Sequence, residues 1–291
     1  MFDPTTDAPA LSLVIPVYNA AARLPATLDA VHAFVAHYVG SVEVIFVDDC
    51  STDVETQLIL EDFTRRQAGT HLLRNQINRG KGFSVARAML YARGRHRVFT
   101  DADLAYPLDQ VHRIVAELDA GADVAIACRV LRESRYVMSP EFFHYLYTRH
   151  LLSRAFNRVV QALLLPGILD TQAGLKGFTA QAAKLCFTQA TIPGFAFDIE
   201  CLYIAQRNGL AICQVPVRFR YDDEPTTIRF ARDGHRMLQD VLHVKRNARR
   251  GRYLAPLPIE PVTTGPAPTT ECPPTFASSS STLTTSGSRP E

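Results

Sequence analysis

Two carboxylates separated by one small residue are the most chemically suggestive feature of the chain. Asp101 and Asp103 follow a short apolar run at 98–99 and flank Ala102. Because side chains alternate along an extended backbone, we expect the two carboxylates to project to the same side of the chain. Paired carboxylates at a strand end suit Mg²⁺ or Mn²⁺, which usually keeps open positions for phosphate oxygens. An isolated Asp-x-Asp is more often a solvated loop, so the surrounding residues decide its meaning.

The elements before this pair predict an α/β fold. Three strand–helix repeats are expected, with strands over 11–17, 42–47 and 71–74 and helices over 20–38, 54–67 and 82–93. The first strand is almost continuously apolar, which is typical of a parallel strand buried on both faces. Such repeats indicate an open, mostly parallel sheet with helices on both faces, in which ligands bind beyond the carboxyl ends of the strands. One rim of this sheet should carry Tyr18, Asp48, Asp49, Lys81, Asp101 and Asp103.

The second half of the chain adds a strand at 123–128, with Arg129 at the same rim, and a long helical pattern at 141–164. That helix has a wide apolar face and a polar stripe with Arg149, Arg154 and Arg158. Two interpretations stay open: a helix lying in a membrane interface, or one packed on the sheet with its arginines towards phosphates. The remaining expected elements are a turn and strand at 170–178, helices at 180–186 and 195–208, an edge-like strand at 211–220, and a helix at 233–250 with a basic end.

Composition and motif searches exclude several classes. The formal charge of +2 argues against generic nucleic-acid binding. The six cysteines are scattered and the nine histidines lack metal-ligand spacing, which favours free thiols in a reducing compartment. We expect neither a signal peptide nor a membrane span, because no apolar run reaches the required ~18 residues. No GxGxxG follows a strand, and the sequence around Gly80-Lys81 lacks the first glycine and the Ser or Thr of a P-loop, so dehydrogenase and kinase functions are not favoured.

Six short motifs occur in a specific order along the chain. They are IPVYN at 15–19, VDDCSTD at 47–53, NRGKG at 78–82, DADL at 101–104, DTQAGLKGF at 170–178 and FDIE at 197–200. Together they make the chain resemble the inverting glycosyltransferases of family 2, over about residues 11–250. Within that family it looks most like the polyprenyl-phosphate sugar transferases, especially the dolichyl-phosphate β-glucosyltransferase branch.

This resemblance implies a GT-A fold at 11–252. From pattern and composition we also expect a short N-terminal extension at 1–10, interfacial or acceptor helices at about 141–165, and a disordered Pro/Thr/Ser-rich tail at 253–291. The resemblance implies an enzyme that moves a hexose from a nucleotide-sugar, with UDP-glucose favoured, to polyprenyl or dolichyl phosphate, with Mg²⁺ or Mn²⁺ on Asp101 and Asp103. The implied nucleotide-sugar contacts are Pro16, Tyr18, Asp48, Asp49, Lys81, Asp101 and Ala102, and the implied catalytic and phosphate contacts are Asp101, Asp103, Arg129, Arg158, Lys176 and Arg229.

The sequence leaves the chemical class of the acceptor open. A lipid monophosphate is largely ionised near neutral pH, since the second pKa of such groups is about 6, and it needs positive charge more than a base. A saccharide or other hydroxyl acceptor would need a general base, for which Asp198 and Glu200 are the candidates, although both could simply orient their helix. A third possibility is an inactive nucleotide-sugar-binding or membrane-surface adaptor. The expected location is cytoplasmic, with peripheral attachment to the cytoplasmic face of a membrane, and no nucleic-acid partner.

Overall fold

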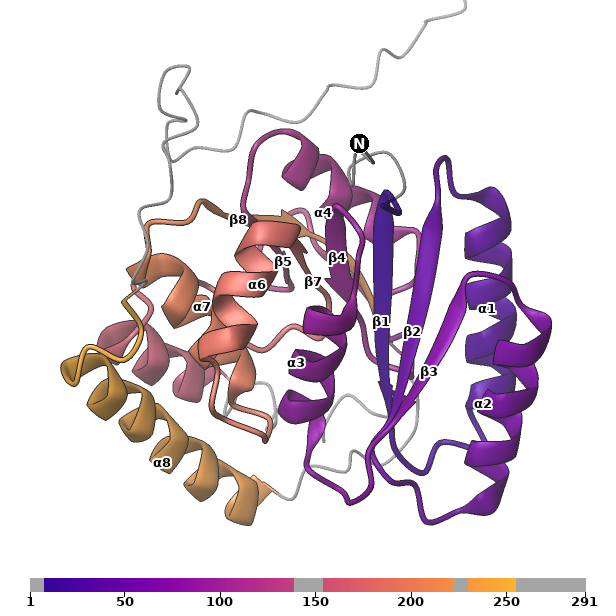
Figure 1. Cartoon of the computed structure of the whole chain (residues 1–291). Coiled ribbons are helices and arrows are strands. Elements are labelled where there is room, and N and C mark those ends of the chain that lie inside the picture. Colours follow the sequence, from indigo (N-terminus) through magenta and orange to yellow (C-terminus); the bar gives the residue numbers. More distant parts are fainter. Residues whose placement is uncertain (1–7, 139–153, 222–229, 255–291) are drawn as a thin grey trace, which may run out of the picture. The chain divides into compact units, whose positions relative to one another are not determined.

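The computed structural model describes residues 8–138, 154–221 and 230–254 of the chain (Figure 1). The strands of the main sheet are β1 (Leu11–Val17), β2 (Val42–Asp48), β3 (Thr70–Arg74), β4 (His96–Phe99), β5 (Val124–Cys128), β7 (Lys176–Thr179) and β8 (Ile212–Pro216). A separate parallel pair consists of β6 (Arg135–Met138) and β9 (Arg218–Tyr221). The helices are α1 (Leu24–His37), α2 (Val54–Arg66), α3 (Lys81–Tyr91), α4 (Gln110–Asp119), α6 (Ala180–Gln189), α7 (Phe197–Arg207) and α8 (Phe230–Arg249), with a further helical segment at 154–163.

The main sheet has the order β3-β2-β1-β4-β7-β5-β8, and all neighbouring pairs are parallel except those of β7. This arrangement confirms the expected open, mostly parallel sheet. Because the parallel strands share one direction, the chain leaves β1, β2, β4 and β5 at the same edge, which we call the carboxyl edge. The loops that follow these strands carry most of the candidate site residues.

Helices cover both faces of the sheet, as expected (Figure 1). Val14 of β1 packs into a core with α3, α6, α7 and α8, whereas its neighbours Leu13 and Ile15 pack into a second core with α1, α2 and α4. All three side chains are fully buried. Burying a side chain of this size stabilises a fold by roughly 1.5–3 kcal/mol, so the apolar run fixes β1 at the centre of the sheet.

Strand β7 runs against the other strands and lies between β4 and β5. Lys176, its first residue, pairs with Phe99 on one side and with Ile126 on the other. The start of β7 is therefore placed at the carboxyl edge, next to the ends of its neighbours. The sequence indicated a strand here but not its direction.

The expected strand at 211–220 is divided in the structure. It becomes β8, in the main sheet, and β9, which pairs with β6. Proline at the end of β8 lacks an amide hydrogen, which agrees with the break. Among the described residues, no helix is long and apolar enough to cross a membrane. Some predictions concern residues outside the described ranges. They are those for residues 1–7, for most of the helix expected at 141–164, and for the tail from 255.

Candidate active site at the carboxyl edge

The turn after β4 carries the two carboxylates. The Leu104 amide donates to the carbonyl oxygen of Asp101 at 3.1 Å, and Leu104 lies at φ +46°. The extended backbone expected here is therefore wrong, because β4 ends at Phe99 and the chain then turns. The two acids nevertheless interact: reduced hydration and the negative charge of Asp101 raise the pKa of Asp103. The exposed Asp103 carboxylate accepts a hydrogen bond from the Ala105 amide at 3.0 Å.

Lys81, the first residue of α3, forms an ion pair with Asp101. Its Nζ lies 2.5 Å from Oδ1 of that carboxylate. Burial lowers the pKa of Lys81, but the charges of Asp101 and Asp198 outweigh burial, so the pKa is raised overall. The positive end of the α3 helix dipole also favours an anion here. A protonated ammonium group is thus held against the two-acid turn.

Gly174, two residues before β7, approaches Asp101. A Cβ atom at this glycine would lie 2.9 Å from Cγ of Asp101, and closer still to its Oδ2. The Asp101 side chain would have to shift to make room for such a Cβ, so the absence of a side chain at Gly174 is what allows this close approach. Sequence reasoning did not single out Gly174, although it lies within the DTQAGLKGF motif.

A second, deeper ion pair joins β7 to α7. Nζ of Lys176 lies 2.8 Å from Oδ1 of Asp198 and donates to the carbonyl oxygen of Ala173 at 2.5 Å. Burial raises the pKa of Asp198, although Lys176 and Lys81 oppose that shift. We refer to Lys81, Asp101, Asp103, Lys176 and Asp198 as the charged cluster, and its formal charge is −1 when all five residues are ionised.

The side chain of Asp48, at the end of β2, is hydrogen-bonded to nearby protein groups. It is fully buried, and its Oδ1 accepts a hydrogen bond from the Ser51 amide at 2.8 Å. Its Oδ2 accepts one from Nε of Arg74 at 3.1 Å. These bonds fix the backbone of the VDDCSTD motif, and a contact of Asp48 with a nucleotide stays a prediction.

Asp49 holds the segment that leads to Lys81. Its Oδ1 accepts hydrogen bonds from Nδ2 of Asn75 at 2.7 Å and from the Arg79 amide at 2.9 Å. Its Oδ2 accepts one from the Gly80 amide at 2.7 Å. Asp49 therefore connects the end of β2 to the residue immediately before Lys81, and its expected contact with a nucleotide also stays a prediction.

Among the described residues, three non-glycine residues have left-handed backbone conformations, and all three lie at the carboxyl edge. They are Asn19 after β1, Cys50 after β2 and Leu104 after β4, at φ +46°, +59° and +46°. Such residues cost of order 1–3 kcal/mol each and tend to cluster where function requires a particular geometry. Next to Asn19, the Tyr18 side chain is 47% exposed at the end of β1, while Pro16 is partly buried. The ring of Tyr18 is thus accessible to a ligand.

Arg129, at the end of β5, is paired with Asp170. Its Nε and Nη2 lie 2.7 Å and 2.9 Å from the two carboxylate oxygens, and its amide donates to Oδ2 at 3.0 Å. The arginine holds the pKa of Asp170 below its usual value, against the effect of burial. The Nε–Nη2 edge of the guanidinium is therefore occupied, so Arg129 can offer a phosphate only its remaining N–H groups. Sequence reasoning missed Asp170, the first residue of the DTQAGLKGF motif.

The other predicted residues occupy different environments. Glu200 is fully buried and bonded elsewhere, Lys176 is fully buried within the charged cluster, and Ala102 is buried between the two acids. Arg158 is exposed on the helical segment 154–163, and Arg229 lies outside the described residues. The burial of Lys176 favours a role in positioning Asp198 over direct contact with a bound phosphate.

The residues of the two-acid turn suit a hard divalent cation. Asp101 and Asp103 supply oxygen atoms only, and the negative balance of the charged cluster favours a cation. Within the described residues, no group of three or more histidine, cysteine, aspartate and glutamate side chains could form a complete protein cage. This composition fits Mg²⁺ or Mn²⁺ bound by one or two carboxylates together with substrate phosphates.

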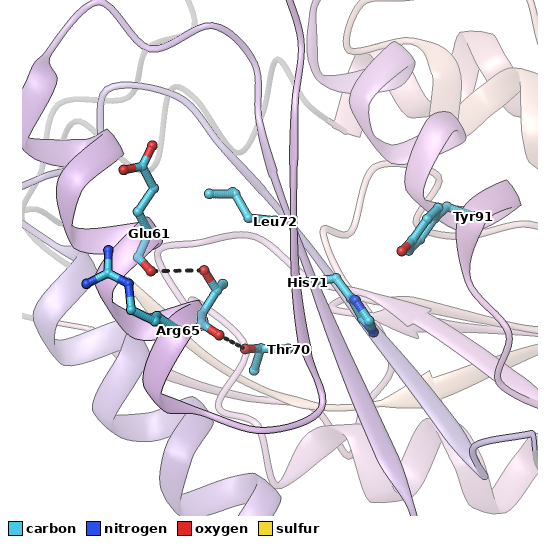
Figure 2. Close-up of a pocket in the computed structure, with 7 residues that line it drawn as sticks. Glu61, Arg65, Thr70, His71, Leu72 and Tyr91 are labelled. Atoms are coloured by element: carbon cyan, nitrogen blue, oxygen red, sulfur yellow. Dashed lines mark hydrogen bonds between the residues drawn. The ribbon is translucent and has the colours of Figure 1, made fainter.

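One pocket in the described part of the chain lies away from these residues. It has a volume of about 460 Å³ at the edge strand β3 and contains none of the charged cluster. Figure 2 shows Glu61 and Arg65 of α2 on one side of β3 and Tyr91 of α3 on the other. The pocket is open and polar, and no predicted site residue lines it. Chemistry, rather than cavity size, therefore identifies the candidate site.

Comparisons with known proteins identify relatives of this chain. The model of the family "Glycosyl transferase family 2" matches residues 12–180. Dolichyl-phosphate beta-glucosyltransferase from Dictyostelium discoideum is 32% identical over 252 residues, covering 84% of this chain and 75% of the relative. The human protein of the same name is 31% identical over 222 residues, covering 72% of this chain and 67% of the relative.

Among solved structures, glucosyl-3-phosphoglycerate synthase from Mycobacterium tuberculosis in complex with phosphoglyceric acid has a TM-score of 0.59 at 21% identity, covering 85% of this chain and 82% of that one. A complex of that protein with Mn²⁺, UDP-glucose and phosphoglyceric acid has a TM-score of 0.58 at 19% identity, covering the same shares. At these identities the structural matches establish the fold.

Proposed function

Because the chain belongs to glycosyl transferase family 2, we propose that it transfers glucose from UDP-glucose to dolichyl phosphate or another polyprenyl phosphate. Four curated relatives that are 28–33% identical are named dolichyl-phosphate beta-glucosyltransferase. The charged cluster gives this proposal a chemical basis, because Asp101, Asp103 and Lys81 lie together at the edge where such sheets bind nucleotides.

The donor would bind at the carboxyl edge. We assign the uridine to the exposed Tyr18, whose ring offers an apolar face, and the diphosphate to the turn that contains Asp101 and Asp103. A divalent cation on these carboxylates would offset the charge that develops on the departing diphosphate. Lys81 keeps its proton beside Asp101 and supplies positive charge from the protein itself.

The burial of both candidate bases is the observation that favours a phosphate acceptor. The Asp198 and Glu200 residues are only 4% and 0% exposed, and each carboxylate is bonded to protein groups. Neither is placed to remove a proton from a hydroxyl acceptor at the surface. A lipid monophosphate, which is already ionised, avoids that requirement.

The outer face of α8 supports peripheral attachment to a membrane. Leu238 and Leu242 are 42% and 53% exposed, while Val241 and Val244 on the other face are buried in the core. The helix ends in a basic group in which Arg246, Arg249, Arg250 and Arg252 are exposed. Each cation near an anionic surface contributes about 1 kcal/mol of attraction. We assign this face to the cytoplasmic surface of a membrane that carries the acceptor.

Sedimentation with vesicles containing anionic lipid tests this face. Leu242→Ser combined with Arg249→Gln should reduce binding several-fold at physiological salt, because apolar area and charge are both lost. Arg65→Gln on α2 removes one exposed cation elsewhere and serves as the control. Equal binding of all three proteins would contradict the assignment.

Transfer of radiolabelled glucose from UDP-glucose to dolichyl phosphate tests the reaction. Label should move into the organic phase, and Asp103→Asn should reduce the rate by roughly 10²-fold or more, on the scale of losing a stabiliser of transition-state charge. Asp62→Asn, a surface acid on α2, is the matched control and should retain the rate. Label on an aqueous saccharide product would favour a hydroxyl acceptor, and donor binding without any transfer would favour an adaptor.

A further inference from the structure

Glu200 joins three segments of the chain. It lies on α7, is fully buried, and accepts four hydrogen bonds. Its Oε2 accepts the amides of Thr191 and Ile192, both at 2.7 Å. Its Oε1 accepts the Thr191 hydroxyl at 2.7 Å and the Tyr253 hydroxyl at 2.6 Å. The carboxylate therefore ties the segment after α6 to α7 and to the chain that follows α8.

The Tyr253 end of this network is itself anchored. The tyrosine is 1% exposed, and its oxygen accepts a hydrogen bond from Nδ2 of Asn247 at 3.0 Å. Asn247 also contacts Nε2 of His243 at 2.9 Å. Glu200 thus lies between the core side of α8 and the backbone at 191–192.

The segment at 191–194 packs directly on the start of α3. The Phe83 amide donates to the carbonyl oxygen of Pro193 at 3.2 Å. A Cβ atom at Gly80 would lie 2.6 Å from that same oxygen, and one at Gly82 would lie 2.6 Å from the carbonyl oxygen of Ile192. The two glycines therefore let this segment contact the backbone on both sides of Lys81.

Lys81 is consequently held between two supports. Asp49 bonds the amides that precede it, and the 191–194 segment packs against the turn that follows it. Two residues apart on a helix differ by about 200° in direction, so Glu200 points away from the charged cluster while Asp198 points into it. The Glu200 carboxylate does not touch the charged cluster, and it bonds the segment that packs beside Lys81.

We propose that Glu200 is a positioning residue, which sets the place of Lys81 in the donor site through the 191–194 segment. Glu200 fixes the two amides, the segment fixes the first turn of α3, and that turn aims the ammonium at Asp101. The role of Lys81 in donor binding rests on the proposed function, whereas the mechanical connection does not.

Hydrogen exchange on the full chain without ligand tests the connection. Glu200→Ala should speed exchange of the Phe83 amide by tenfold or more, although Glu200 does not touch it. Glu200→Gln should largely restore protection, since its oxygen can accept the two amides while its amino group donates to the two hydroxyls. Unchanged exchange at Phe83, with faster exchange at 191–192, would overturn the proposal.

Glu43 provides a matched control. It is 2% exposed and accepts hydrogen bonds from the Ser12 hydroxyl, the Arg93 amide and the Gly94 amide, near the start of β2. Glu43→Ala should loosen that opposite edge of the sheet and leave the Phe83 amide as it was. If both alanine variants speed exchange at Phe83 equally, the effect is general destabilisation and the proposal fails.

Binding of UDP-glucose then separates positioning from simple loss of structure. Glu200→Ala should weaken binding by about ten- to a hundredfold, the scale of a misplaced contact. In a Lys81→Ala background the same change should have little further effect, because the residue it positions is gone. Independent, multiplicative losses would overturn the proposal. If Glu200→Ala does not fold, Tyr253→Phe, which removes one of the four hydrogen bonds to Glu200, carries the same comparison at smaller amplitude. A chain that never binds UDP-glucose would contradict the proposed function, and the exchange result would still decide the connection.

Discussion

Replacing Gly174 with alanine is the sharpest perturbation of the two-acid turn. The new Cβ would lie 2.9 Å from Cγ of Asp101, whereas ordinary contacts begin at 3.4 Å. The carbon must therefore move by at least about 0.5 Å, and Oδ2, which lies closer still to the new Cβ, by roughly 1 Å. That movement would pull Oδ1 away from the Lys81 ammonium, now 2.5 Å distant. A misplacement of about 1 Å in a catalytic site can cost roughly 10²-fold in rate, or about 2.7 kcal/mol.

The same substitution should leave stability nearly unchanged. Gly174 does not have a positive φ, so alanine fits its backbone. Alanine restricts the unfolded chain and stabilises by about 0.4–1 kcal/mol. Weakening a partly exposed ion pair loses a similar amount, about 0–1 kcal/mol. The two effects largely cancel, and the melting temperature should shift by only about 2–4 °C or less.

Steady-state transfer assays with titrated Mn²⁺ would measure the effect on kcat/KM and on the cation concentration required. Gly177→Ala is the matched control, because its Cβ would lie 3.1 Å from Cδ1 of Leu118 and would overlap Ile114 in the core. That variant should lose about 1–3 kcal/mol of stability and keep its affinity for the donor. If Gly174→Ala retains the wild-type kcat/KM and cation requirement, the position of Asp101 does not govern the reaction and our reasoning is refuted.

Three further predictions concern charge. Asp170→Asn should destabilise the protein by about 3 kcal/mol in urea unfolding, because it leaves Arg129 without its anionic partner; a loss below about 1 kcal/mol would show that the pair is unimportant. The pKa of Glu43 is lowered by its hydrogen bonds and by Arg93, in spite of burial. A lowered folded pKa means that this stabilisation is complete above the usual value of 4.5 and disappears as the pH falls through the folded pKa. Unfolding free energies measured at pH 6 and pH 4 should therefore differ less in Glu43→Gln than in the wild type. Chelation should abolish transfer, and Mn²⁺ or Mg²⁺ should restore it; transfer that persists in excess chelator would contradict the metal assignment.

The central strands could be predicted from the sequence because their burial is continuous. The apolar run at 11–17 matches β1 at both ends, and the strands that lead to Asp48 and Arg129 were also expected where they occur. In a parallel sheet, these strands place their following loops at one edge. The region of the site therefore followed from hydrophobic pattern and chain direction alone.

Local geometry within that region was harder to predict. The backbone at Asp101 turns because Leu104 adopts a left-handed conformation, which a leucine gives no reason to expect. The difference between Asp198 and Glu200 depends on partners distant in the sequence, Lys176 for one and Tyr253 for the other. A single sequence shows that two acids share a helix but does not reveal which of them meets a lysine.

The roles of several glycines could not be predicted from the residues next to them in the sequence. The segment around Gly80 was compared with a phosphate-binding loop, yet in the structure this glycine and Gly82 make room for the backbone at 192–194. Gly174 likewise makes room for Asp101. Each of these contacts joins segments far apart along the chain, and for that reason no local pattern could identify them.

Because β7 runs antiparallel to its neighbours, its pairing in the core sets the position of residues at the candidate active site. A parallel strand ends at the carboxyl edge, and the loop that follows it can adjust to small shifts of the strand. In β7 the chain instead passes the carboxyl edge first and then pairs with β4 and β5. The positions of Gly174 and Lys176 therefore depend on the register of that pairing. A slip of one residue would shift them by about 3.3 Å and turn every side chain of the strand to the opposite face. Substitutions that shift the register of β7 against β4 or β5 should therefore reduce turnover before they unfold the protein.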